Sequence, residues 1–343
     1  MKKIFMTTTA LVAFGLITGQ AMAADAPTVT LGGFSQWNYY VSDNKNSSGN
    51  HVLDGNEAEL HIMAKGSADN GLTYGATFEM FATNGNGTAN SDENYLWLTG
   101  NFGTVEIGSN DGAADVLGVR VPTGFGTGGL DGDWGNGGTD WTFAGPTFSA
   151  DETDDANKIS YFGSFGAVNV GISYVPYTTA EDHTTAPATA GGYINAVEAG
   201  ITYTGNAGGY DFTVGAVGTT GSSRDVTLED LSTWEVGANV SRGAWVFGIN
   251  YADNGNSGEA STASDDEDMV GVGATYTTGD WTFGANYAMA DDGANDADVL
   301  AVGLTYAVAP GLSVGAEVVA WDEKIAGVSD DGQVYILTSS VAF

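Results

Sequence analysis

Large apolar residues alternate with small or polar residues along most of the chain. The pattern is clearest in four segments, 210–217, 234–241, 244–251 and 281–289. In the last of these, Trp281, Phe283 and Tyr287 are separated by threonine, glycine, asparagine and other small residues. A period of two over eight to ten residues predicts β-strands with one apolar face.

Sixteen segments of this kind follow one another: 28–42, 51–66, 71–83, 92–100, 103–109, 157–163, 166–175, 194–204, 209–218, 232–241, 244–252, 268–277, 280–289, 298–307, 311–321 and 332–343. Many exceed the usual length of strands in soluble sheets and match the length of about 9–11 residues that crosses a bilayer. Their connections alternate between tight turns, such as 278–280, and long acidic loops, such as 178–192. Short turns on one side and long loops on the other are typical of transmembrane β-barrels.

The final segment ends on an aromatic residue. Tyr335, Leu337, Val341 and Phe343 share one face of this strand, whereas Thr338 and Ser340 lie on the other. In a transmembrane barrel the last strand pairs with the first, and a terminal ring sits in the interfacial aromatic girdle. The sequence therefore predicts an all-β fold, an antiparallel transmembrane barrel of about sixteen strands. A barrel of this size encloses an aqueous lumen rather than a packed core.

The N-terminus has the three parts of a secretory signal peptide. Lys2 and Lys3 precede the apolar run 10–17, and Ala21-Met-Ala23 fits a cleavage site. The apolar run is too short to span a bilayer. We expect residues 1–23 to be removed on export, and residues 24–343 to form the barrel.

Charge is strongly one-sided. The chain holds 43 acidic and 9 basic residues, for a formal charge of −34, and loss of Lys2 and Lys3 would leave seven basic residues. No basic patch is available for nucleic acid or anionic lipid. The acidic residues cluster between the strands, and the many aromatic residues argue against disorder. Cysteine is absent, so disulfides do not hold the fold.

One long segment, 110–156, breaks the alternation. It is rich in glycine but also carries apolar residues such as Val116, Leu117, Phe125 and Trp134, which need a surface to pack on. Structureless segments of this length are usually functional or disordered, and the apolar residues favour a functional loop.

Several short motifs, in this order, resemble the Gram-negative general porins, sixteen-stranded trimers of the outer membrane, and most closely their alphaproteobacterial branch. They are the opening Thr28-Val-Thr-Leu-Gly-Gly33, the turn Asn101-Phe-Gly-Thr-Val-Glu-Ile-Gly108, the return Asn157-Lys-Ile-Ser-Tyr-Phe162 and the terminal Phe343. The resemblance implies that 110–156 folds into the barrel as a constriction loop. It also implies a homotrimer in the bacterial outer membrane, in contact with lipid and lipopolysaccharide, that passes small hydrophilic solutes and cations and requires no cofactor.

The resemblance further implies that acidic residues of this loop face a cluster of arginines. The loop candidates are Asp111, Asp115, Arg120, Asp131, Asp133 and Asp140. The facing wall departs from the family, because only His51, His61 and Lys65 are candidates for its positive charge. Carboxylate rings favour cations. The expected function is therefore a diffusion channel that is selective for cations.

The sequence leaves three alternatives open. Asp131 and Asp133 have a spacing that could hold Ca²⁺ or Mg²⁺, but the distal glutamate of a calcium loop is missing and solvated loop charge is the favoured reading. The aromatic residues could form a stacking path in a pore biased toward sugars or amino acids, although an interfacial girdle explains them better. A secreted, acidic calcium-binding β-protein is the third. No G-x-S-x-G or H-E-x-x-H motif occurs, and an enzyme is not expected.

Overall fold

The computed structural model describes residues 23–42, 51–81, 91–124, 153, 155–178, 192–257, 266–293, 295–325 and 327–343. These residues form sixteen strands and one short helix. Their bounds are β1 Ala23–Ser42, β2 His51–Ala68, β3 Thr73–Phe81, β4 Ser91–Gly100, β5 Gly103–Ser109, α1 Ala113–Leu117, β6 Asn157–Phe165, β7 Val168–Tyr177, β8 Tyr193–Ala207, β9 Tyr210–Ser223, β10 Leu231–Arg242, β11 Trp245–Gly255, β12 Glu267–Thr278, β13 Trp281–Asp291, β14 Asp296–Ala309, β15 Leu312–Ile325 and β16 Val328–Ala342. Each of the sixteen predicted strands is present. No helix in this part of the chain is long and apolar enough to cross a membrane.

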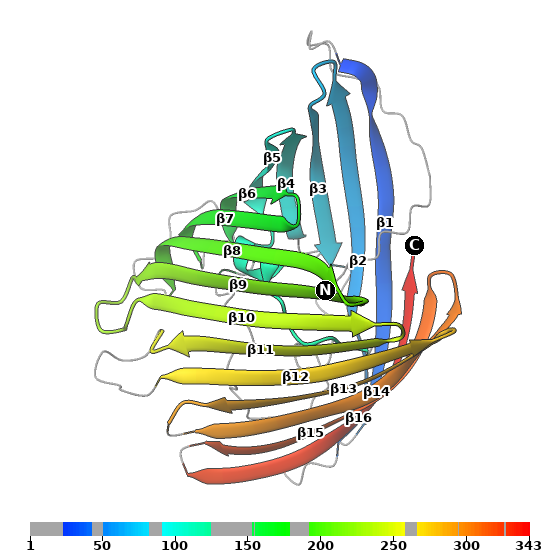
Figure 1. The fold of residues 1–343 in the computed structure, drawn as a ribbon, viewed down its shortest axis with the longest axis vertical. Coiled ribbons are helices and arrows are strands. Elements are labelled where there is room, and N and C mark those ends of the chain that lie inside the picture. The colour runs from blue at the N-terminus through cyan, green and yellow to red at the C-terminus, as the bar shows by residue number, and fades with distance from the viewer. Residues whose placement is uncertain are drawn as a thin grey trace.

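The strands form one closed antiparallel barrel in which each strand pairs with its neighbours in sequence (Figure 1). Closure joins the blue β1 to the red β16, with Phe34 opposite Ala342 and Ser42 opposite Val334. At the seam, Gly33 and Phe343 each donate a backbone N–H to the other's carbonyl at 3.0 Å. Gly33 has a φ of 153°, and a Cβ there would lie 2.1 Å from the carbonyl oxygen of Glu59. Only glycine therefore fits at this point of the seam.

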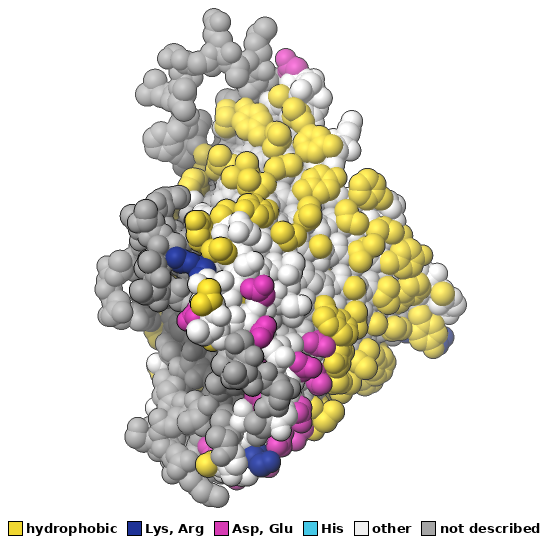
Figure 2. Space-filling view, turned by 90° about the vertical axis from the view of Figure 1, so that its left-hand side faces the viewer, with side chains coloured by type: hydrophobic (Ala, Val, Ile, Leu, Met, Phe, Trp, Pro, Cys, Tyr) yellow, Lys and Arg dark blue, Asp and Glu magenta, His cyan; other side chains and the backbone are white. Residues whose placement is uncertain are grey.

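Large apolar side chains cover the outside of the barrel. Figure 2 shows them as a broad band, with acidic side chains beside this band rather than within it. Trp245, Phe247 and Ile249 on β11 are 47, 54 and 51% exposed, as every second residue of a strand with an outer apolar face should be. Tyr335, Leu337 and Val341 of β16 are also exposed, as predicted, and so is Phe343, which directly follows the strand.

The aromatic residues divide between the two faces of the wall. Trp37, Tyr39, Trp234, Trp245 and Trp281 are exposed on the outer face, in agreement with a girdle. Tyr40 and Trp321 belong instead to a buried cluster on the inner face, at 1 and 4% exposure. Because they are buried there, they do not form a continuous exposed path along the pore.

The strands extend further toward the long loops than the alternation predicts. β15 and β16 remain paired through Asp322 opposite Asp331 and Lys324 opposite Ser329. These outer segments carry charged residues on both faces, so the apolar alternation ends while the backbone hydrogen bonds continue. Hydrophobic periodicity detects the part of a strand that faces lipid, not the whole paired segment.

Candidate functional site

The chain enters the barrel after β5. Residues 110–124 run along the inner wall, and the helix α1 contacts β7, β8 and β9 (Figure 1). Further along, the Thr305 hydroxyl of β14 donates to the Gly124 carbonyl at 3.1 Å. The inner segment 110–124 therefore follows the wall from β7 to β14. Residues 125–152 and 154 of the predicted constriction loop, which include Asp131, Asp133 and Asp140, lie outside the described residues.

Glycines on the inner face of the strands make room for this inner segment. A Cβ at Gly237 of β10 would lie 1.6 Å from the Val119 carbonyl oxygen, and one at Gly248 of β11 would lie 2.5 Å from Pro122 Cδ. Similar contacts with the inner segment occur at Gly171, Gly200 and Gly215. These glycines are not at positive φ, so the close approach of backbone, rather than a turn, requires them.

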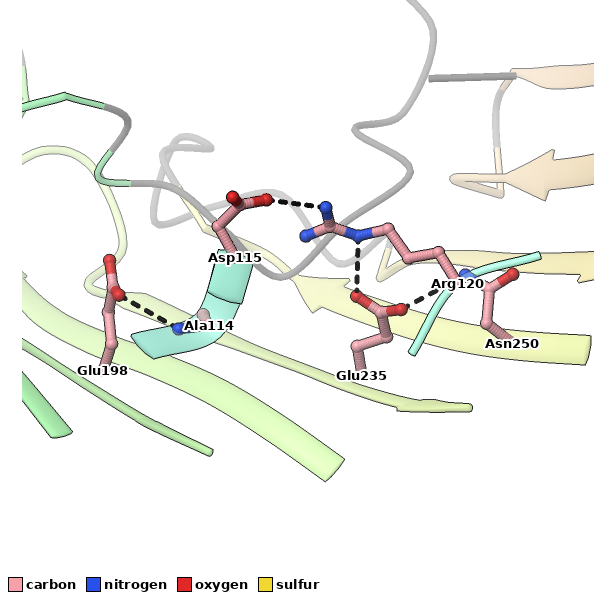
Figure 3. Close-up of polar contacts among 6 residues, drawn as sticks. All are labelled: Ala114, Asp115, Arg120, Glu198, Glu235 and Asn250. Atoms are coloured by element: carbon pink, nitrogen blue, oxygen red, sulfur yellow. Dashed lines mark hydrogen bonds and ion pairs between the residues drawn. The ribbon is translucent and has the colours of Figure 1, made fainter. Parts of the chain in front are cut away.

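Glu198 of β8 anchors the start of the inner segment. Its side chain has no exposed surface. Its Oε2 accepts the Ala114 backbone N–H at 3.1 Å (Figure 3), and its Oε1 accepts the Thr153 hydroxyl. Next to it, the Ser173 hydroxyl accepts the Ala113 N–H at 2.9 Å. The first helical N–H groups, which have no partner within a helix, are thus bound by the barrel wall.

Arg120 fixes the next part of the inner segment, as Figure 3 shows. Its Nη1 lies 2.7 Å from Asp115 Oδ1, and its Nε lies 3.5 Å from Oε2 of Glu235, a carboxylate that is 1% exposed. Asn250 Nδ2 donates to the other oxygen of Glu235 at 3.4 Å. The guanidinium is therefore shared between two carboxylates, one on the loop and one on β10.

A cavity of about 1420 Å³ opens beside the inner segment. The charged side chains that line it, among the described residues, are Glu93, Glu106, Asp111, Asp115, Arg120 and Asp211. Asn110 Nδ2 donates to Glu106 at 2.7 Å. The described part of the lining thus holds five carboxylates and a single guanidinium, which is itself in contact with two carboxylates.

The predicted site residues are only partly brought together. Asp111, Asp115 and Arg120 line the cavity. His61 and Lys65 lie on the inner face of β2, alternating with the 37% exposed Leu60 of the outer face. The position predicted for His51 was wrong. Its Nδ1 lies 3.1 Å from the hydroxyl of Tyr39, an outward-facing residue of β1, because an irregularity in the β1–β2 pairing shifts the register above Gln36.

Several inward charges were missed by sequence reasoning. They are Glu59, Glu79, Glu93, Lys158, Glu198 and Glu235. Lys158 is 2% exposed and stands beside Ile159, which is 53% exposed on the outer face. Its alternation with an outer apolar residue was a usable signal that Lys158 points inward.

The loop ends of the barrel are acidic as well. Asp225 follows β9, and its carboxylate accepts the backbone N–H of Thr227 at 2.9 Å and the hydroxyl of Thr227 at 2.7 Å. These hydrogen bonds lower the pKa of Asp225 below its usual range, because they stabilise the charged form. The carboxylate therefore keeps its negative charge at mildly acidic pH.

A closed barrel of sixteen strands with an apolar outer face and a polar, hollow interior defines a transmembrane channel. The sequence matches the family model of the Gram-negative porins over residues 7–324, and the chain belongs to that family. It is accordingly a passive diffusion channel of the bacterial outer membrane and not an enzyme. This assignment overturns the alternative of a secreted calcium-binding β-protein.

Solved porins have the same fold. An anion-selective porin from Comamonas acidovorans is 18% identical with a TM-score of 0.66, and the match covers 93% of this chain and 100% of that one. A mutant of the Rh. blastica porin is 18% identical with a TM-score of 0.63, covering 92% and 100%. A loop-deletion mutant of OmpT from Vibrio cholerae is 16% identical with a TM-score of 0.65, covering 93% and 100%. No curated protein matches the sequence.

Proposed function

We propose that this porin selects cations over anions, and that 110–156 is its constriction loop. The observation that carries the proposal is the lining of the cavity, where five carboxylates accompany one guanidinium in the part of the chain that the structure describes. Arg120 contributes little positive potential to the pore, because Asp115 and Glu235 lie against it. A lumen with a net negative lining concentrates cations and excludes anions.

The fold itself does not set the sign of selectivity. The Comamonas porin that shares this fold is described as anion-selective. Residues that line the lumen tune selectivity, so the charges around the cavity decide the outcome. Lys158 also points to the inner side of the wall, but it is almost completely buried and is not among the residues that line the cavity.

The reversal potential of the purified protein in a planar bilayer under a KCl gradient tests the proposal. We expect a potential whose sign reports K⁺ permeating faster than Cl⁻. In the variant Asp111→Asn, which removes one lining carboxylate, we expect a smaller K⁺ preference. Arg120→Gln leaves Asp115 and Glu235 without their positive partner, so it should increase the K⁺ preference.

The matched control is Asp296→Asn. Asp296 lies at the start of β14, where its carboxylate is 59% exposed and 3.4 Å from Lys324. It does not line the cavity, so the reversal potential should stay at the wild-type value. A Cl⁻ preference in the wild type, or the same potential in the Asp111 and Arg120 variants, would contradict the proposal.

We further propose that the protein assembles as a homotrimer and that residues 1–23 are removed on export. Support comes from the family resemblance and from the three-part pattern of the N-terminus. Conductance that rises in groups of three equal steps supports the trimer, and single isolated steps contradict it.

Mass spectrometry of the protein from outer membranes reports the cleavage site, which we expect after Ala23. Liposome swelling with a panel of sugars and amino acids then reports any bias among solutes.

A further inference from the structure

Three potential metal ligands converge on the inner wall between β2 and β3. Glu59 and His61 are two residues apart on β2 and therefore share a face, while His61 is directly opposite Glu79 on β3. The Nε2 of His61 lies 2.6 Å from Oε2 of Glu59 and 3.3 Å from Oε2 of Glu79. All three ligand atoms lie within 4.8 Å of one another.

The surroundings hold these side chains in place. Glu79 is 5% exposed, and its backbone is paired with that of His61 in the β2–β3 ladder. The Phe34 ring of β1 meets the His61 ring edge to face, with centroids 6.2 Å apart. The His61 side chain remains 24% exposed, which leaves an approach for an ion and its water. Ligands on strands that are paired on both sides need little reorganisation to bind.

We propose that Glu59, His61 and Glu79 form a binding site for a divalent transition-metal ion of the Zn²⁺ class. His61 Nε2 and one oxygen from each carboxylate would be the protein ligands, with water from the lumen completing a tetrahedral set. In the absence of metal, Nε2 carries the proton that bridges to Glu59, because an ionised carboxylate can only accept. To bind the ion, Nε2 must present its lone pair: a neutral imidazole then carries its proton on Nδ1, whereas an imidazolium releases the Nε2 proton to solvent. The two positive charges of the ion balance the two carboxylates.

The ligand types favour such an ion over calcium. Zinc binds histidine nitrogen and carboxylate oxygen at about 2.0–2.2 Å, so neighbouring ligand atoms stand a little over 3 Å apart. The distance from His61 Nε2 to Glu79 already fits, and that to Glu59 needs a small opening. Imidazole suits zinc, copper and nickel, whereas sites made only of oxygen suit calcium and magnesium.

A nearby group provides an internal contrast. Glu93, Asp111 and Asp155 also converge within 4.8 Å, but they offer only oxygen ligands. Excess Ca²⁺ should therefore occupy this oxygen-only group. It should not displace a zinc ion from the site that contains His61. The zinc proposal does not depend on the sign of ion selectivity.

Isothermal titration calorimetry with ZnCl₂ tests the proposal on the full-length protein, prepared without a histidine tag, treated with chelator and held in excess Ca²⁺. We expect one Zn²⁺ bound per chain. Because even an outer-shell partner of a ligand changes affinity about 10–100-fold, loss of the imidazole in His61→Gln should weaken binding at least ~10-fold. Glu59→Gln is the second variant and should weaken it as well.

The control replaces the other two histidines, His51→Gln with His183→Gln, and should bind Zn²⁺ as the wild type does. Heat-modifiable electrophoretic mobility establishes that each variant is a folded barrel before titration. The proposal is overturned if His61→Gln and Glu59→Gln both bind as the wild type does, or if excess Ca²⁺ abolishes Zn²⁺ binding. Failure of this test would leave the reversal-potential result unaffected, because the two experiments measure different residues.

Discussion

At the scale of single residues, buried carboxylates on the barrel wall hold the inner segment in the lumen. Glu198 and Glu235 have almost no exposed surface, and each contacts this segment, at Ala114 and at Arg120. A buried charge is costly unless it is paired or hydrogen-bonded. The wall and the inner segment therefore stabilise each other, because each supplies the partners that the other's buried groups need.

Replacing Glu198 by alanine should release the start of the inner segment. The Ala114 N–H and the Thr153 hydroxyl would lose their acceptor, at a cost of about 1–3 kcal/mol for each group left buried and unpaired. We expect faster hydrogen exchange at the Ala114 amide and greater noise in the open-channel current.

Glu198→Gln is the matched variant for this prediction. Its amide oxygen keeps an acceptor at the same place, so it should perturb exchange less than alanine does. If alanine and glutamine gave the wild-type exchange rate and current noise, Glu198 would not be an anchor.

At the scale of the elements, the residues on the inner faces of strands β7 to β12 fit the inner segment 110–124 that lies against them. Their inner faces place glycine where α1 and the residues after it pass closest, at Gly200, Gly215, Gly237 and Gly248. Glycine weakens a strand interior. The compensation is a close fit between two stretches of backbone, which side chains on the wall would prevent.

Gly237→Ala should therefore push the inner segment away from the wall. The new methyl group would meet the Val119 carbonyl, whose oxygen lies 1.6 Å from the Cβ position. Because this displacement is directed into the lumen, we expect a lower single-channel conductance than in the wild type.

Gly315→Ala on β15 is the control for the strand itself. It also lies within a paired strand, but its Cβ would come no closer than 3.1 Å to another atom and would not touch the inner segment. Its conductance should equal that of the wild type. Equal conductance in all three proteins would show that the segment does not rest on Gly237.

At the scale of the whole molecule, a closed seam is what allows a β-sheet to sit in lipid. β1 and β16 pair from Phe34–Ala342 to Ser42–Val334, so the barrel has no unpaired edge. The Gly33–Phe343 pair and the bond from the Ala342 N–H to the Gly311 carbonyl extend this pairing to the final residues.

Deletion of residues 341–343 should reduce the yield of folded barrel. The Gly33 and Gly311 groups would lose their partners, and each unsatisfied backbone group in the hydrocarbon region costs several kcal/mol. Refolding in detergent, followed by heat-modifiable mobility and circular dichroism, measures the yield. Phe343→Ala keeps the backbone bonds and should refold better than the deletion; an equal yield from both would assign the effect to the ring instead.

The sequence by itself determined the fold class and the number and order of the strands, but not the short helix α1 within 110–156. Every second residue of a strand, such as Trp245, Phe247 and Ile249, must be apolar because it faces lipid. This requirement applies to each strand separately, so the alternation along the sequence shows it. The same alternation predicted a barrel in which the last strand pairs with the first. The resemblance of short motifs to porins then supplied the family.

Only the tertiary structure decided which inward charges meet. Nothing in the spacing of Asp115, Arg120 and Glu235 places them in one network, because closure of the barrel and the path of the inner segment bring them together. His51 and His61 lie on one strand, yet an irregular register turns them to opposite faces, and His61 instead meets Glu79 across the ladder. Lipid does not constrain which residues occupy the inward positions. The partners of inward side chains depend on contacts between residues far apart in the sequence, and hydrophobic periodicity does not predict such contacts.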